Sequence, residues 1–184
     1  MLHKLYLILL IALLISNTEA QASEFRVSAG YFNLEAKTST QRTNLGNLGV
    51  YRFAYAAAIG DHFSFQPGYS LYVIGTSSFD LGYGLDLNFG YYPLSLNRGY
   101  RQSYKNIKWQ QTDELRPFVM VSFYQRQYQS IQSTYAGLGL SLGADYQLQS
   151  IALFARGGLA LLKGPFGAQI SEITAQIGVS KALP

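Results

Sequence analysis

The sequence predicts an all-β fold, an eight-stranded antiparallel up-and-down transmembrane β-barrel. The first observation is the segment Phe79 to Tyr91, whose odd positions are all Phe, Leu or Tyr and whose even positions are all Asp, Asn or Gly. This alternation gives a strand one apolar face and one small, polar face, and the length suits the roughly 9 to 11 residues of a membrane-crossing strand. The second observation is that charged residues make up only 13% of the chain, against about 25% in soluble domains.

The same period of two residues recurs along the chain and defines eight candidate strands. In seven of them one face is clearly apolar. The fifth is apolar on both sides around Phe118, Val119, Met120 and Val121, so its facing stays open. The expected strands are 25–31, 48–59, 63–73, 79–91, 115–127, 136–148, 151–161 and 173–180.

Connection lengths support a meander of hairpins, because paired residues must point to the same face. A two-residue link at 149–150 and three-residue links at 60–62 and 75–77 keep the faces consistent. These links pair Leu148 with Ile151, Ile59 with Phe63, and Ile74 with Ser78. Extracellular loops are expected at Lys37 to Asn47 and at Leu162 to Ile170.

The first 22 residues are typical of a secretory signal peptide. A short basic start at His3 and Lys4 precedes an apolar run from Leu5 to Ile15, and Ala20-Gln21-Ala22 provides a small-x-small cleavage site. We therefore expect a signal peptide at 1–22 and one barrel domain at 23–184. The chain has no cysteine, which excludes disulfides, a lipid-anchor cysteine and thiolate metal sites.

The direction of the small face decides between two classes of protein. In a soluble eight-stranded barrel such as a lipocalin the bulky face fills the interior, and the outer face carries Lys, Glu and Thr. Here the second face is Gly, Ser, Ala and Asn with a few charges, which suits the crowded lumen of a small membrane barrel. The charges on this face are Arg26, Arg52, Asp80, Asp86, Asp145 and Arg156.

These six charges are predicted to form an ion network across the lumen, because an isolated buried charge is strongly unfavourable. The expected hairpin register sets Gly143 opposite Arg156, which places Asp145 diagonal to Arg156 and within its reach. Two interpretations stay open: a permanently closed polar plug that holds the barrel shape, and an ion path or gate.

The chain resembles the small outer-membrane β-barrel family, with a build like the transmembrane domain of outer-membrane protein A and the opacity-like porins. The resemblance lies in the signal, Leu85-Asp86-Leu87-Asn88-Phe89-Gly90-Tyr91-Tyr92, Leu115-Arg116-Pro117-Phe118-Val119, and the Gly-alternating segment from Tyr135 to Leu148. It implies a location in the outer membrane of a Gram-negative bacterium and insertion by the barrel assembly machinery. It implies no particular activity.

The connection from Pro93 to Glu114 is the longest and is too short to hold two more spanning strands with their turn. If the N-terminus is periplasmic, this connection is periplasmic too, where such barrels usually have short turns. It is interpreted either as a contact with lipid phosphates, peptidoglycan or a partner, or as a solvated loop with interfacial aromatics. Its basic and aromatic residues are Arg98, Tyr100, Arg101, Tyr104, Lys105, Lys108 and Trp109.

No catalytic, cofactor or metal site is expected. After the signal only His62 remains among the histidines, and it lies in a predicted turn next to Asp61 and near Ser64. Sequence adjacency rarely assembles a Ser-His-Asp set, and one His with dispersed carboxylates lacks metal-ligand spacing. The net charge of +4 is scattered, so no nucleic-acid partner is expected.

The expected function is a structural or interaction role in the cell envelope, with outer-membrane lipids as the main contact. A narrow pore for small solutes is the alternative, and a lipid-modifying barrel enzyme, like the acyltransferases and deacylases of this size, ranks below both. Eight strands generally leave no aqueous channel, which favours the first.

Overall fold

The computed structural model describes residues 23–37, 42–75, 79–94, 101–104, 107–110, 115–128, 133–148 and 151–182. Within these ranges the backbone alone is described at 42–48, 74–75, 79–80, 101–104 and 107–110. The expected signal peptide therefore lies outside the described residues. None of the helices in the described part of the chain is both long enough and apolar enough to cross a membrane.

The described chain is almost entirely β-strand, with one short 3₁₀ turn. The elements are β1 (Ser23–Lys37), β2 (Arg42–Ile59), β3 (Phe63–Gly75), β4 (Phe79–Tyr91), β5 (Arg101–Tyr104), β6 (Ile107–Gln110), β7 (Leu115–Tyr128), β8 (Ser133–Leu148), β9 (Ile151–Lys163), η1 (Pro165–Gly167) and β10 (Gln169–Ala182).

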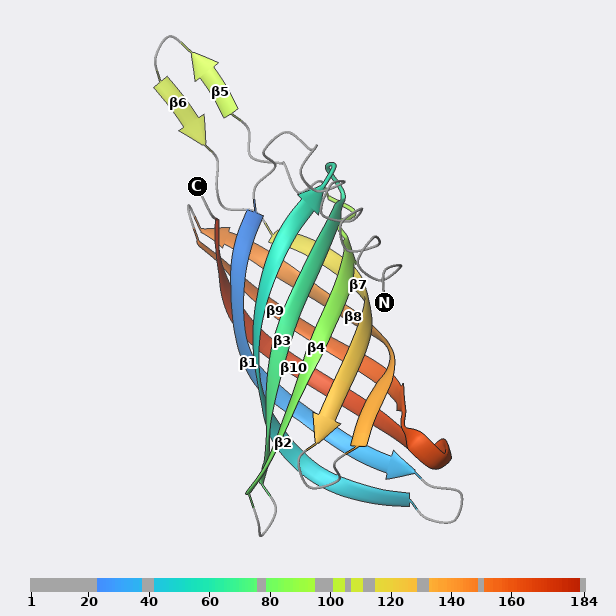
Figure 1. Cartoon of the computed structure of the whole chain (residues 1–184). Coiled ribbons are helices and arrows are strands. Elements are labelled where there is room, and N and C mark those ends of the chain that lie inside the picture. Colours follow the sequence, from blue (N-terminus) through green and yellow to red (C-terminus); the bar gives the residue numbers. More distant parts are fainter. Residues whose placement is uncertain are drawn as a thin grey trace, which may run out of the picture.

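Eight of these strands form a closed barrel in the order β1-β10-β9-β8-β7-β4-β3-β2 (Figure 1). All neighbours are antiparallel, and the first and last strands close the wall, from Glu24 opposite Ala182 to Lys37 opposite Gln169. The predicted eight-stranded up-and-down barrel is thus confirmed. The hairpin of β5 and β6, which the sequence did not predict, forms a separate two-stranded sheet.

The two ends of the barrel differ. We call the turn end the one where β1 begins, β10 ends and the short links β2–β3 and β8–β9 lie; the β5–β6 hairpin also projects from this end (Figure 1). The loop end is the opposite one, where β1 meets β2, β3 meets β4, β7 meets β8 and β9 meets β10.

Two of the three expected hairpin registers are confirmed: Ile59 pairs with Phe63, and Leu148 pairs with Ile151. The third is wrong, because Ile74 pairs with Asp80 and not with Ser78. The observed register places aromatic residues opposite each other on the outer wall, which explains the difference. The pairs are Phe63 with Tyr91, at a ring distance of 5.4 Å, and Phe65 with Phe89, at 5.0 Å.

Strands at the loop end are longer than expected. Most of the expected loop from Lys37 to Asn47 is strand, since β1 continues to Lys37 and β2 begins at Arg42. The expected loop from Leu162 to Ile170 shrinks to 164–168. The physical reason is inward packing: Leu34, Leu162 and Ile170 are buried inside the barrel and continue the alternation beyond the predicted ends.

The outer wall is an apolar belt. Its side chains are odd-numbered on β9 and β10 and even-numbered on β8, as expected, and many are more than half exposed, including Leu161 at 69% and Ile177 at 70%. In β7 the open question is settled, because odd positions such as Val121 and Phe123 face out and even positions such as Met120 face in. A continuous apolar exterior of this kind is unfavourable in water and favourable in a bilayer.

A cation in the middle of this belt should be destabilising. We expect Ile177→Arg to lower the free energy of unfolding in lipid vesicles by about 2–4 kcal/mol, and the control Gln169→Arg at the loop end to lower it by less than about 1 kcal/mol. Urea titration followed by the gel migration of folded and unfolded barrel measures both values. Equal costs at the two positions would contradict a membrane-embedded belt.

Candidate functional site

The lumen is the candidate site, and glycines on its wall make room for large side chains from neighbouring strands. A Cβ atom at Gly84 would lie 2.8 Å from the Arg126 guanidinium, and one at Gly139 would lie 2.5 Å from the Tyr124 ring. The small residues of the lumen face therefore do not leave an empty channel. Arg and Tyr side chains from neighbouring strands pack over these small residues.

The central cluster consists of Asp86, Arg52, Arg126, Ser70 and Glu172, all buried. Arg52 Nε donates to Asp86 Oδ2 at 2.8 Å, and Ser70 Oγ donates to the same oxygen at 2.5 Å. Arg126 Nη1 binds the other carboxylate oxygen of Asp86. One buried carboxylate on β4 is thus shared by two guanidinium groups, one from the neighbouring strand β7 and one from β2, which lies beyond β3 on the other side.

Arg126 links this carboxylate to a second one. Its Nε lies 3.5 Å from Glu172 Oε1, which also accepts a hydrogen bond of 2.9 Å from the Tyr128 hydroxyl. The Arg126 guanidinium carbon lies 4.2 Å from the centre of the Tyr124 ring and 4.9 Å from that of Tyr72. Two anions and two aromatic faces therefore stabilise this buried cation.

A second cluster, the turn-end cluster, contains Arg26, Asp145, Glu24, Arg116 and Tyr92. Arg26 Nη2 lies 2.8 Å from Asp145 Oδ2 and 2.9 Å from Glu24 Oε2. Arg116 Nη2 lies 3.9 Å from a carboxylate oxygen of each of these acids, and the Tyr92 hydroxyl donates to Asp145 at 3.3 Å. Charges at this end are balanced, with two cations beside two anions.

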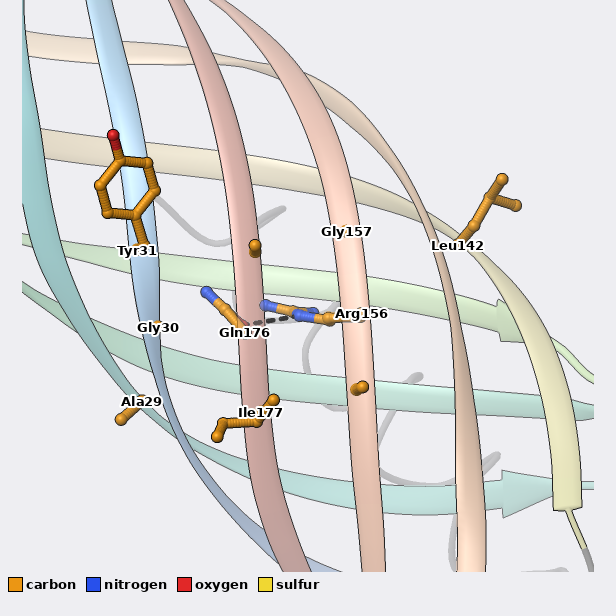
Figure 2. A pocket seen from close by; sticks show the side chains of 10 residues that line it. Ala29, Gly30, Tyr31, Leu142, Arg156, Gly157, Gln176 and Ile177 are labelled. Atoms are coloured by element: carbon orange, nitrogen blue, oxygen red, sulfur yellow. Dashed lines mark hydrogen bonds between the residues drawn. The ribbon is translucent and has the colours of Figure 1, made fainter.

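Arg156 differs from the other lumen arginines. Its Nε donates to Gln176 Oε1 at 2.7 Å (Figure 2), and its Nη1 approaches Met120 Sδ at 3.9 Å. Among the described residues no carboxylate lies within ion-pair distance of it. The expected contact with Asp145 is therefore wrong, although Gly143 does pair with Arg156. Asp145 is instead engaged by Arg26, whose guanidinium lies 5.3 Å from the Phe154 ring.

A shallow hollow of about 500 Å³ lies in the outer wall beside β9 and β10, the strands that carry Arg156 and Gln176 (Figure 2). It forms because several outward positions on β1, β9 and β10 carry little or no side chain, while Tyr31 and Leu142 stand at its edges. These small residues are Ala29, Ala155, Gly157 and Ala175.

The apolar plug fills the lumen toward the loop end. It is a cluster of buried apolar and aromatic side chains, and several have no solvent exposure. Phe32 and Tyr72 pack edge to face at 4.7 Å, and Tyr128 packs against Tyr135 at 6.0 Å. The plug comprises Phe32, Leu34, Val50, Tyr72, Tyr124, Tyr128, Tyr135, Ala160, Leu162 and Ile170.

The structure places most of the predicted network in the lumen but groups it differently. Arg52 and Asp86 belong to the central cluster, Arg26 and Asp145 belong to the turn-end cluster, and Arg156 lies apart from both. The side chain of Asp80 lies outside the described part of the structure.

Four charged lumen residues were missed, and each has an identifiable reason. Arg116 and Arg126 were missed because the facing of the fifth strand was open, and the arginines themselves were the available signal for it. Glu24 and Glu172 lie one residue before the expected starts of the first and last strands. If the alternation of the two expected strands is extended by one residue toward the N-terminus, Glu24 and Glu172 both fall on the lumen face.

The expected contact loop is described only in part. Arg98, Tyr100 and Lys105 lie outside the described residues, and Arg101, Tyr104, Lys108 and Trp109 are described by their backbone in β5 and β6. In this hairpin Gln102 pairs with Trp109 and Ser103 pairs with Lys108.

His62 connects two chain segments at the turn end. Its ring Nδ1 lies 2.8 Å from the carbonyl oxygen of Tyr92, and the Tyr92 backbone N–H donates to the His62 carbonyl oxygen at 2.8 Å. Ser64 Oγ accepts a hydrogen bond from Gln66 Nε2 at 3.0 Å. The geometry thus gives His62 the role of tying the β2–β3 turn to the end of β4.

Removing paired and unpaired lumen arginines should have different costs. We expect Arg126→Met to lower the free energy of unfolding by about 3–5 kcal/mol, because Asp86 and Glu172 lose a buried counterion. Arg156→Met, which removes the same charge without stranding a carboxylate, should cost clearly less. Urea titration in lipid vesicles measures both, and equal losses would contradict the assignment of the ion pairs.

The sequence matches no protein-family model and no curated protein. Solved structures do match it. Neisserial surface protein A has a TM-score of 0.54 and 17% identity, with 86% of this chain and 97% of that one covered. The outer membrane protein OprG from Pseudomonas aeruginosa has a TM-score of 0.51 and 10% identity, with 89% and 97% covered. A de novo designed transmembrane β-barrel has a TM-score of 0.50 and 14% identity, with 90% and 98% covered. Together with the closed wall, the apolar belt and the filled lumen, these similarities show that the chain has the fold of the small eight-stranded outer-membrane β-barrels.

Proposed function

We propose that this protein is an integral outer-membrane barrel with a structural or interaction role in the bacterial cell envelope and without an open channel. The apolar belt supports membrane insertion, because its exposed Leu, Ile and Phe side chains would aggregate in water. In this proposal the first 22 residues direct export and are removed, and the barrel assembly machinery inserts the mature chain.

The main observation that supports a barrel without an open channel is its filled lumen. Tyr128, Phe32 and Leu34 in the plug and Asn88 near the central cluster have no exposed surface. The charged groups between the plug and the turn end are held by ion pairs and hydrogen bonds, so opening a path would strand buried charges. This layering supports a closed barrel over a narrow pore.

The proposed orientation places the turn end in the periplasm and the loop end at the cell surface. Barrels of this class have short periplasmic turns and longer extracellular segments. The shortest link, at 149–150 between β8 and β9, lies at the turn end, and the longer hairpin links at 38–41, 129–132 and 164–168 lie at the loop end. The connection between β4 and β7, which holds the β5–β6 hairpin, is the exception at the turn end. The β5–β6 hairpin then lies on the periplasmic side, where its basic and aromatic residues are available for lipid phosphates, peptidoglycan or a partner.

The proposal includes no catalysis. The single histidine of the barrel domain contributes a backbone contact at the turn end, and Ser64 and Ser70 are hydrogen-bonded to Gln66 and Asp86. The Ser70 hydroxyl donates to a carboxylate, but Asp86 is buried and paired with Arg52 and Arg126, which supports a structural role for this contact. A lipid-modifying activity would be revealed by acyl release from labelled lipid A incubated with the purified barrel.

Membrane fractionation with heat-modifiable gel migration, followed by planar-bilayer conductance on the same sample, tests both parts of the proposal. We expect outer-membrane recovery, a migration shift on boiling, and no conductance steps for the wild type or for Arg156→Ala. A 16-stranded porin in the same bilayer serves as the positive control, since its lumen is an aqueous channel. Steady conductance of the wild type would favour the pore, and recovery in a soluble fraction would reject the membrane barrel.

A further inference from the structure

The two rims of the apolar belt carry different residues. At the turn end the outward side chains are largely aromatic, with rings on neighbouring strands in contact, as for Phe63 and Tyr91. At the loop end, on β1, β9 and β10, the outward side chains are lysine, glutamine, serine and, at Glu35, glutamate. The turn-end aromatics are Phe25, Tyr55, Phe63, Tyr91 and Tyr146, all exposed.

Three of the loop-end residues lie side by side across the sheet. Lys37 of β1 pairs with Gln169 of β10, and Gln169 pairs with Lys163 of β9. All three are exposed on the outer face. Neighbouring strands lie about 4.8 Å apart, so the two lysine backbones are roughly 10 Å apart. We call these three residues the cationic row.

The two lysines of the cationic row form no ion pair with another described residue. Among the described residues neither Lys37 nor Lys163 has a carboxylate within 4.0 Å. Glu35, which is partly buried, is two residues before Lys37 and hence on the same face, on the membrane side of the row. In the register of β1 and β2 the backbone of Arg42 lies opposite Lys37, which adds a third basic residue at the edge of the row.

The cationic row borders the apolar belt directly on β9, and polar residues lie between the row and the belt on β1 and β10. On β9 the outward residue two positions before Lys163 is Leu161, and on β10 the outward residues after Gln169 are Ser171 and then Ile173. Leu161 and Ile173 are 69% and 56% exposed. Lysines at such a boundary can keep their stems on apolar surface while their ammonium groups reach the headgroup layer.

The turn between β9 and β10 adds an exposed aromatic side chain beside the row. Phe166 is fully exposed and has a backbone φ of 56°, a conformation that is rare for a bulky residue. Two hydrogen bonds hold the turn, from Gly164 N to Ala168 O at 2.8 Å and from Ala168 N to Pro165 O at 3.1 Å. The turn thus places an exposed ring beyond the cationic row, on the side away from the apolar belt.

We propose that the cationic row binds the phosphate groups of a phosphorylated glycolipid in the outer leaflet. The proposal rests on the proposed membrane orientation. Cations at a membrane surface attract anionic headgroups, and two lysines flanking an amide donor suit a headgroup with two separated phosphates. The described turn-end rim carries the single outward lysine Lys181 among aromatic and aliphatic residues, so it does not offer two lysines that flank an amide.

Binding of diphosphorylated lipid A to the full barrel in non-ionic detergent tests the proposal. We expect Lys37→Gln/Lys163→Gln to bind about 30-fold more weakly than the wild type, from the loss of two lysine–phosphate attractions. Lys181→Gln is the matched control, because Lys181 is an exposed outward lysine at the turn end, and it should bind like the wild type.

Three outcomes would overturn the proposal: equal affinity of the double variant and the wild type, an equal loss in Lys181→Gln, or equal binding of fully dephosphorylated lipid A. Competition by inorganic phosphate at concentrations equal to the lipid would identify free phosphate as the ligand and also reject it. Each variant is first examined by heat-modifiable migration and membrane fractionation. A folded outer-membrane barrel that shows no phosphate dependence rejects this inference alone, whereas a chain absent from the outer membrane rejects the proposed function.

Discussion

Closure of the sheet is the constraint on which the rest of the structure depends. In hydrocarbon no water is present to satisfy backbone N–H and C=O groups, so an exposed sheet edge is excluded and the first and last strands must pair. The pairing of β1 with β10 provides this closure along nearly the full length of both strands. With only eight strands in the wall, the enclosed space is narrow, and everything inside it must pack.

The packing requirement explains the unusual composition of the lumen face. Gly84 lies where the Arg126 side chain packs on the inner surface of the wall, and Gly139 lies under the Tyr124 side chain. Each arginine brought into this space then needs a counterion or another acceptor. Arg126 has two carboxylates and two aromatic rings, while Arg156 has one amide oxygen and a sulfur atom. Within the described residues the lumen charges therefore form separate clusters, in which each guanidinium has at least one partner while single atoms such as Arg52 Nη2 and Glu172 Oε2 have no hydrogen bond.

The outer wall differs from the lumen in that its residue types change from one rim to the other. Its middle is apolar all round, which is consistent with a bilayer on every side, but its rims differ in chemistry. Aromatics gather at the turn end, and at the loop end two lysines, on β1 and β9, flank a glutamine on β10. A difference of this kind gives the barrel a direction across the membrane. It also makes the loop-end rim, and not the filled lumen, the surface at which we place ligand recognition.

The number of barrel strands, their approximate bounds and, for seven of them, the face directed to lipid could be predicted from the sequence, because these features depend on alternation along each strand, as in Phe79 to Tyr91. The same alternation placed Arg26, Arg52, Asp86, Asp145 and Arg156 on the lumen face. Which of these residues meet could not be predicted, since Arg26 and Asp145 are joined across β10 and β9 and not by a shared hairpin. Contacts between distant strands depend on barrel closure and on side-chain length, and neither is encoded in a local period of two residues.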